Sequence, residues 1–203
     1  MINSTNIKAV LNSSVGVDIV AATKSRTIDQ INALKQFGIT KAGENRVQEF
    51  LQKYDFVDGI EWHFIGNLQT NKVKYIVDKV KMIQSVDRES LAKEIDNQCS
   101  KKGVKMDVLI EVNVGEDQKG GVDLSQTQIL ADYICSLKNL SLKGLMCIPP
   151  QNAHDDIYIK IKQTFDLLKD KYDLKILSLG MSDDYQKAIK FGANMIRPGS
   201  ILF

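Results

Sequence analysis

The sequence predicts an α/β protein in which residues 1–203 form a single (β/α)8 barrel of the TIM type. Eight short β-branched or apolar runs alternate with helical patterns along the whole chain. Such alternation favours a parallel sheet, and eight units suit a closed barrel. The alternative is an open doubly wound sheet. It would be indicated by a glycine-rich turn after the first strand, but Ala21-Ala22-Thr23-Lys24-Ser25-Arg26 stands there.

The expected strands share a run of β-branched and apolar side chains. They are Val17–Thr23, Ile39–Ala42, Trp62–Ile65, Met82–Gln84, Val108–Val114, Leu142–Met146, Ile176–Leu179 and Asn194–Ile196. Between them, apolar residues recur every three or four positions, as in amphipathic helices. These patterns are Ile28-Ile31-Leu34-Phe37, Leu91-Ile95, Ile129-Tyr133-Leu137, Ile157-Ile161-Phe165-Leu168 and Tyr185-Ile189.

Composition excludes several classes of protein. The 27 basic and 25 acidic residues give a net charge of +2, which argues against a nucleic-acid or membrane-surface protein. No apolar run approaches the roughly 20 residues of a membrane span. Three scattered cysteines and two histidines make a zinc site unexpected and suit a reducing compartment. We therefore expect a cytoplasmic protein, and its opening residues lack the regions of a signal peptide.

Lys24 is the first candidate for chemistry, because barrel sites lie where the strands end. Side chains alternate along a strand, so Lys24 shares a face with Ala22 and Val20. If that face points inward, Lys24 stands at the barrel mouth, partly desolvated. Desolvation lowers the pKa of a lysine and frees its amine to attack an aldehyde. A solvent-facing lysine at a strand end is the alternative, which position alone favours.

The loops after the seventh and eighth strands predict a phosphate site, as is habitual in this barrel. Gly180 permits a tight turn, Ser182 can bind backbone or ligand, and Gly199 and Ser200 form a second small-residue turn. Ser182 could instead cap a helix, and Gly199 could be a simple turn residue. Asp183 and Asp184 would repel a phosphate if they pointed at it.

Further polar residues fall near the strand ends. Arg197 could point inward and donate to a ring nitrogen, or could be a surface or carboxylate-paired arginine. Asn45 could reach a ligand oxygen, although spacing favours a helix cap. Glu111 shares a strand face that could line the upper interior. His63 and Cys147 are expected to be packed interior residues.

Together these segments resemble the pyridoxal phosphate homeostasis protein family. The resemblance runs in order through nearly the whole chain. It rests on Ala21-Ala22-Thr23-Lys24-Ser25, Gly43-Glu44-Asn45-Arg46-Val47-Gln48-Glu49, Trp62-His63-Phe64-Ile65-Gly66-Asn67-Leu68-Gln69-Thr70-Asn71-Lys72, Ile83-Gln84-Ser85-Val86-Asp87, Glu111-Val112-Asn113-Val114, Gly144-Leu145-Met146 with Pro150, and Leu179-Gly180-Met181-Ser182-Asp183-Asp184.

The resemblance implies a barrel like the N-terminal domain of alanine racemase that binds pyridoxal 5′-phosphate (PLP). By position, Lys24 matches the Schiff-base lysine and Arg197 the arginine near the pyridine nitrogen. The other implied cofactor-binding residues are Asn45, Met181, Ser182, Gly199 and Ser200. Two departures are Pro198, where the family usually has an aliphatic residue, and the end at Phe203, where most relatives continue.

The resemblance further implies a monomeric carrier that holds PLP, releases it to apoenzymes and keeps the free aldehyde low. We expect the barrel to use all 203 residues. No second domain would then close the site or supply a partner base, as proton abstraction requires. The alternatives are a PLP-dependent amino-acid racemase or decarboxylase, and an aldolase using Lys24 on a sugar phosphate. An interaction protein without PLP has little support.

Overall fold

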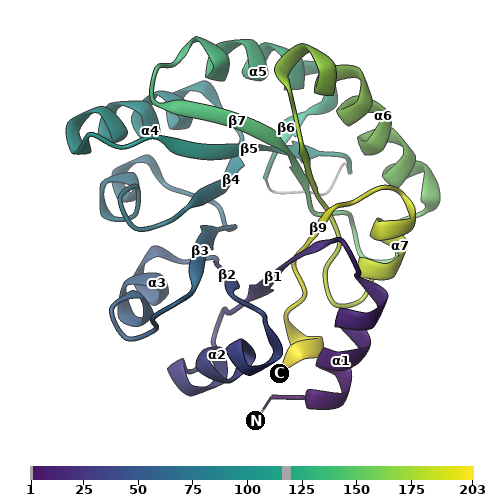
Figure 1. Cartoon of the computed structure of the whole chain (residues 1–203). Coiled ribbons are helices and arrows are strands. Elements are labelled where there is room, and N and C mark those ends of the chain that lie inside the picture. The colour runs from purple at the N-terminus through teal and green to yellow at the C-terminus, as the bar shows by residue number, and fades with distance from the viewer. Residues whose placement is uncertain (1, 116–119) are drawn as a thin grey trace.

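The computed structural model describes residues 2–115 and 120–203, and within them the strands form a closed ring surrounded by helices (Figure 1). All strand pairings are parallel, and eight strands close because β4 pairs with β5 while β9 pairs with β1. A short ninth strand, β6, pairs with β5 outside the ring. The strands are β1 (Asp18–Ala22), β2 (Lys41–Glu44), β3 (Glu61–Phe64), β4 (Met82–Val86), β5 (Met106–Asn113), β6 (Val122–Asp123), β7 (Leu140–Cys147), β8 (Ile176–Ser178) and β9 (Met195–Ile196).

Helices cover the outside of the ring, and the two ends of the chain lie close together (Figure 1). The backbone N–H of Asn3 donates to the carbonyl of Leu202, which ties the first helix to the last turn. The α-helices are α1 (Ser4–Ser13), α2 (Ile28–Leu34), α3 (Val47–Tyr54), α4 (Glu89–Lys102), α5 (Thr127–Ser136), α6 (Asp155–Tyr172) and α7 (Tyr185–Lys190). The 3-10 turns are η1 (Lys35–Phe37), η2 (Thr70–Tyr75), η3 (Leu124–Gln126) and η4 (Ser200–Leu202).

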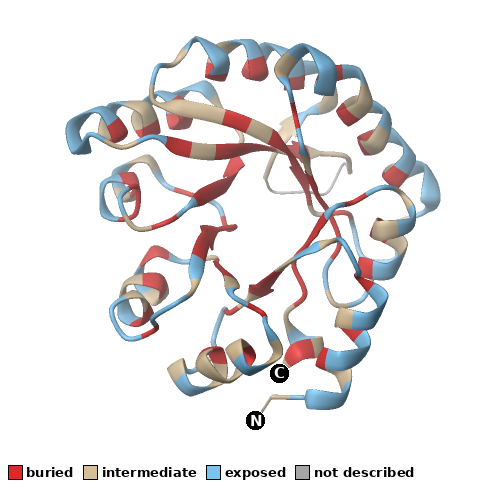
Figure 2. Ribbon diagram, in the orientation of Figure 1, coloured by how far each residue is buried: buried red, intermediate tan, exposed pale blue. Residues whose placement is uncertain are grey.

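The core has an outer layer and an inner one. Most buried apolar side chains lie between the strands and the inward faces of the helices, so each helix alternates between buried and exposed stripes (Figure 2). A smaller cluster of Met82, Leu109 and Met146 is separate from this layer. Since β-strand side chains alternate, the strands supply both layers from opposite faces.

The predicted barrel is confirmed, and each of the eight expected strands is present. The second begins two residues later than expected, because Ile39 packs in the outer cluster before pairing starts at Lys41. The helix α1 was not predicted from the sequence. Only Ile7 and Val10 of this short, polar helix are buried, so its apolar periodicity is weak.

Candidate functional site

Lys24 lies immediately beyond the carboxyl end of β1, in a turn, and is exposed. Its ammonium group has no hydrogen bond or ion pair with residues 2–115 or 120–203. The partial desolvation expected for this side chain is therefore absent. The physical reason is that β1 ends at Ala22, so Lys24 lies beyond the last strand residue and is open to solvent. Condensation with an aldehyde requires an accessible amine in its unprotonated form, and Lys24 meets the requirement of access.

The loops after β8 and β9 meet through Ser182. The Ser182 Oγ accepts hydrogen bonds from the backbone N–H groups of Gly199 (2.9 Å) and Ile201 (3.2 Å). The helix-cap alternative for Ser182 is wrong, because α7 begins at Tyr185 after Asp184. Two converging N–H donors around a hydroxyl form a cradle suited to an anion, because backbone donors favour negative charge.

The end of β1 is joined directly to this cradle. The Ala22 N–H donates to the Pro198 carbonyl at 2.8 Å, so the chain leading into Lys24 pairs with the chain leading into Gly199. Pro198 supplies no N–H of its own, but the cradle uses those of Gly199 and Ile201. The proline therefore leaves both donors of the cradle intact.

Arg197 is 3% exposed and its guanidinium is held inside the barrel. It donates to the Ser178 Oγ at 2.6 Å and to the Cys147 carbonyl at 2.8 Å. Burial lowers the pKa of Arg197 to about 10. Because this value is still well above 7, the side chain stays positively charged at neutral pH. The inward orientation predicted for Arg197 is confirmed, and the surface alternative is wrong.

A chain of hydrogen bonds continues from Arg197 across the barrel interior. The Ser178 Oγ donates to the Gln84 Oε1 at 2.7 Å. The Gln84 Nε2 lies 2.8 Å from the His63 Nδ1, and the His63 Nε2 lies 3.1 Å from the Glu61 Oε1. His63 is 1% exposed, which confirms that it is an interior residue. Because each buried group is satisfied by the next, the chain fixes the position of the guanidinium.

Glu111 adds a carboxyl to the same region. Burial, and to a lesser degree the neighbouring Asp87, raises the pKa of Glu111 to about 7, while Arg197 opposes the shift. Gly120 packs against this carboxyl, since an added Cβ would lie 3.3 Å from the Glu111 Oε1. Glu111 can therefore gain or lose a proton near neutral pH.

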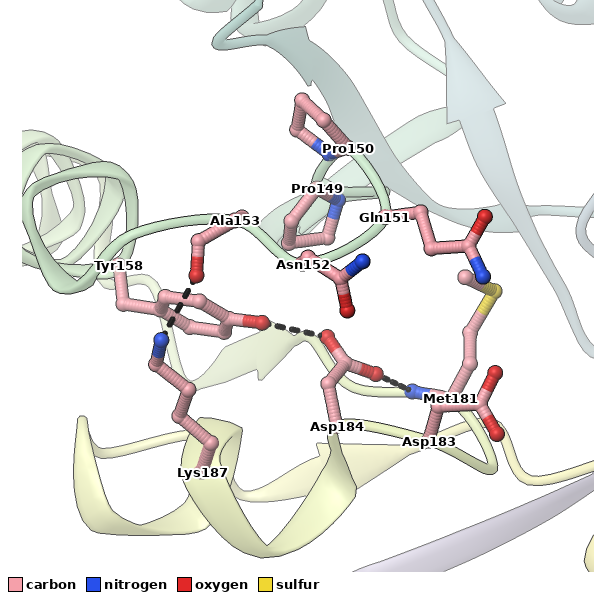
Figure 3. A pocket seen from close by; sticks show the side chains of 10 residues that line it. All are labelled: Pro149, Pro150, Gln151, Asn152, Ala153, Tyr158, Met181, Asp183, Asp184 and Lys187. Carbon is pink, nitrogen blue, oxygen red and sulfur yellow. Dashed lines mark hydrogen bonds between the residues drawn. The ribbon is translucent and has the colours of Figure 1, made fainter.

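A cleft of about 780 Å³ opens beside Ser182, between the loops that follow β7 and β8 (Figure 3). Met181, 38% exposed, lies on its rim. The rim is braced by Asp184, which accepts from the Met181 N–H at 2.6 Å and from the Tyr158 hydroxyl at 2.7 Å. Asp184 thus uses both oxygens on the protein rather than pointing a free charge at the cradle.

Two predicted site residues are less closely joined to the others. Ser200 is exposed and adjoins the cradle as the first residue of η4. Asn45 lines a different cleft with Asn67 and Lys72, between the loops after β2 and β3. The expected helix cap at Asn45 is wrong, because α3 follows Arg46 and has no side-chain cap.

Sequence reasoning missed the partners that hold these residues. Ser178 and Gln84 are 94 positions apart, and only the closed barrel brings their side chains together. Glu44 and Lys53 form a buried ion pair behind the Lys24 turn. The four-residue spacing of Glu49 and Lys53 could have predicted that these two side chains interact, since residues four apart share one helix face.

Within the described ranges, no helix has the length and apolar character to cross a membrane. No group of three or more histidine, cysteine or acidic side chains is placed to hold a metal ion in the same ranges. Cys147 is fully buried, as expected, and Cys99 and Cys135 are also free thiols.

The architecture and the site correspond to a known class of barrel. A family model described as the alanine racemase N-terminal domain matches residues 3–203. An alanine racemase of Clostridium difficile superposes with a TM-score of 0.80 at 15% identity, covering 100% of this chain and 60% of that one, and so shares the fold.

Closer relatives identify the family. A pyridoxal phosphate homeostasis protein of Aquifex aeolicus is 43% identical over 194 residues, which is 91% of this chain and 85% of that protein. One of Helicobacter pylori is 37% identical over 92% of this chain and 87% of its own length. The chain belongs to the pyridoxal phosphate homeostasis protein family. The structure of PipY from Synechococcus elongatus, with PLP bound, has a TM-score of 0.88 and 28% identity, covering 97% of this chain and 98% of that one.

Proposed function

We propose that this protein binds PLP through Lys24 and serves intracellular PLP homeostasis as a carrier or buffer, without substrate turnover. The observation that carries the proposal is the placement of an unpaired lysine next to an anion cradle. The Ala22–Pro198 hydrogen bond joins the two at the same end of the barrel. The name of the family and the PLP bound to PipY support the choice of ligand.

The residues present fit this cofactor. When bound, PLP supplies an aldehyde that condenses with a primary amine to a Schiff base and releases one water. Lys24 offers the amine and the Ser182 hydroxyl offers a donor to the phosphate. The N–H groups of Gly199 and Ile201, which donate to the Ser182 Oγ, would become further donors by exchanging that acceptor for a phosphate oxygen. Ser200, Met181 and Asn45 are proposed to complete the binding site.

Arg197 supports a holding role over a catalytic one. Its positive charge allows it to donate a hydrogen bond to the pyridine nitrogen but not to protonate it. An unprotonated pyridine is a weaker electron sink, which disfavours carbanion chemistry. The exposure of Lys24 points the same way, because proton abstraction benefits from a site that excludes water.

The test is the visible absorption spectrum of the purified protein titrated with PLP, beside Lys24→Ala. The wild type should develop the band of the bound cofactor and Lys24→Ala should lack it. Lys101→Ala, which removes an exposed lysine from α4, is the matched control and should keep the band. An unchanged band in Lys24→Ala would place the cofactor on another lysine and refute the assignment.

Turnover assays separate the carrier from its rivals. Incubation of the PLP-loaded protein with individual L- and D-amino acids should give no epimerisation or decarboxylation beyond that of free PLP. Steady consumption would instead support a racemase or decarboxylase. Borohydride trapping of a sugar phosphate, with no PLP band, would support an aldolase.

We also propose the location, oligomeric state and partners of the protein. It would be a cytoplasmic, monomeric carrier that exchanges PLP with apoenzymes. Transfer can be measured as reactivation of a PLP-dependent apoenzyme by the loaded protein in the presence of a trap for free PLP. Activity recovered only at the rate of free PLP release would contradict direct delivery.

A further inference from the structure

The turn that carries Lys24 has an unusual backbone. Ser25, the next residue, has a φ of 59°, in the left-handed region that residues with a Cβ seldom adopt. Such a conformation is strained and persists where surrounding contacts hold it. The Lys24 side chain makes no hydrogen bond or ion pair with the described residues, so other groups must hold the turn.

Contacts from β2 and α3 hold the residues on both sides of Lys24. Before it, the Thr23 carbonyl accepts a hydrogen bond from the Lys53 Nζ at 2.8 Å. The Thr23 hydroxyl donates to the Glu44 Oε1 at 2.6 Å. After it, the Ser25 N–H donates to the Glu49 Oε2 at 2.9 Å. The reactive residue is therefore bracketed by three hydrogen bonds that never touch its own side chain.

These groups form one charged cluster outside the ring of strands. The Lys53 Nζ lies 2.6 Å from the Glu44 Oε1 and 3.7 Å from the Glu49 Oε2. Glu44 is fully buried and Lys53 is 8% exposed. The Ser25 N–H holds the pKa of Glu49 below its usual range, and Lys53 adds to this effect. Glu49 is therefore ionised at neutral pH.

A buried ion pair is a poor device for stability alone. Its desolvation offsets much of the attraction, and apolar replacements are often as stable. The second oxygen of Glu44 is buried without a hydrogen-bond partner among the described residues, which adds to the cost. What the pair does hold, at both of its ends, is the backbone and hydroxyl of the residue before Lys24.

We propose that Glu44, Glu49 and Lys53 act as positioning residues, a clamp that holds the Lys24 turn in the conformation competent to react with the cofactor aldehyde. This inference rests on the proposed function, since it assigns these residues a role through Lys24. The three residues act on Lys24 through the main chain, because their hydrogen bonds fix the positions of Thr23 and Ser25 on either side of it. Modest misplacement of a reacting group lowers its reactivity strongly, so loss of the clamp weakens cofactor binding even though Lys24 remains.

The principal test is the double variant Glu44→Gln/Lys53→Met, which removes both charges and leaves neither one buried alone. Three quantities are measured: the PLP dissociation constant from the absorption band, the pH midpoint of that band, and amide hydrogen exchange of the Lys24–Ser25 segment without PLP. The expected results are PLP binding weakened about tenfold or more, a shifted midpoint and faster exchange in this segment.

The matched control is Asp78→Asn/Lys102→Met. The Lys102 Nζ also donates to a backbone carbonyl, that of Lys74 at 2.7 Å, and to the Asp78 Oδ1 at 2.7 Å. These two bonds join α4 to η2 and to the turn that follows η2, away from Lys24. Whatever its effect on stability, the control variant should keep the PLP dissociation constant and the pH midpoint of the wild type.

Two further variants keep the proposal testable if the double variant does not fold. Glu49→Ala removes only the acceptor of the Ser25 N–H from a partly exposed position and should also weaken PLP binding and speed exchange. Lys53→Arg keeps the charge and the donors and should retain most of the wild-type PLP affinity. If Glu49→Ala or a folded double variant kept the wild-type PLP dissociation constant, pH midpoint and amide exchange rate, the clamp proposal would be refuted. The proposed function would still stand. A wild type without the PLP band would overturn the proposed function and the clamp with it.

Discussion

Replacement of Glu111 by glutamine should stabilise the protein above neutral pH and leave its stability unchanged in acid. The folded-state pKa of Glu111 is raised to about 7 from an ordinary value of 4.5, chiefly by burial. At pH 4 the carboxyl is protonated in both the folded and the unfolded chain, so ionisation costs nothing. Between pH 4.5 and 7 the unfolded state releases this proton while the folded state keeps it, so stability falls over that window, and above pH 7 the full cost of burying the charge remains.

The size of this effect follows from the shift. Each pKa unit corresponds to about 1.4 kcal/mol, so the full penalty at pH 8 is about 3 kcal/mol. Glutamine has nearly the same shape and removes the charge. Urea unfolding of the PLP-free protein at pH 4.5, 6, 7 and 8 should therefore show Glu111→Gln gaining 1 to 3 kcal/mol over the wild type as pH rises, on the order expected from linkage.

The exposed turn residue Asp58 supplies the control, because Asp58→Asn also removes one carboxylate. Its unfolding free energy should follow that of the wild type at every pH tested. A Glu111→Gln variant whose advantage is the same at pH 4.5 and pH 8, or is absent at pH 8, would show that the Glu111 carboxyl is not raised by burial and refute the reasoning.

Three further perturbations are informative. Ser182→Ala leaves two backbone N–H groups without their acceptor, so urea unfolding should show a loss of about 1 to 2 kcal/mol, and unchanged stability would argue against the cradle. Gly144→Ala should prevent soluble folding, because the added Cβ would lie 1.8 Å from the Ile176 carbonyl oxygen; a soluble protein with the wild-type circular dichroism spectrum would contradict this contact. Of the three thiols, only that of Cys135 is exposed, so it alone should react rapidly with an aromatic disulfide at pH 7.5, while all three react in urea. Rapid reaction of a second thiol in the folded protein would show that the core is more open than described.

Most of the fold could be predicted because its signals are local. Eight apolar runs separated by helical periodicity leave few architectures, and the absence of a glycine-rich first turn removed the main alternative. The helix α1 was not predicted because it buries few apolar side chains. Its attachment to the end of the chain is a contact between distant segments that no local pattern encodes.

The site was predictable where a residue acts from a strand end and less so where it acts through a partner. Lys24 and Ser182 were found by their position after β1 and β8. Glu44 was not, because a strand glutamate becomes fully buried only when Lys53 from the following helix neutralises it. Asn45 is turned to its own cleft, and its backbone packs so closely on Gly66 that a Cβ there would lie 2.3 Å from the Asn45 carbonyl oxygen.

The most direct test of the central claim is to locate the cofactor chemically. The protein is loaded with PLP, reduced with borohydride to fix the linkage, digested and mapped by mass spectrometry. One pyridoxyl group per chain is expected, carried by the peptide that contains Lys24 and absent from Lys24→Ala. A pyridoxyl group on a different lysine, or no covalent label in a protein that still binds PLP, would contradict it.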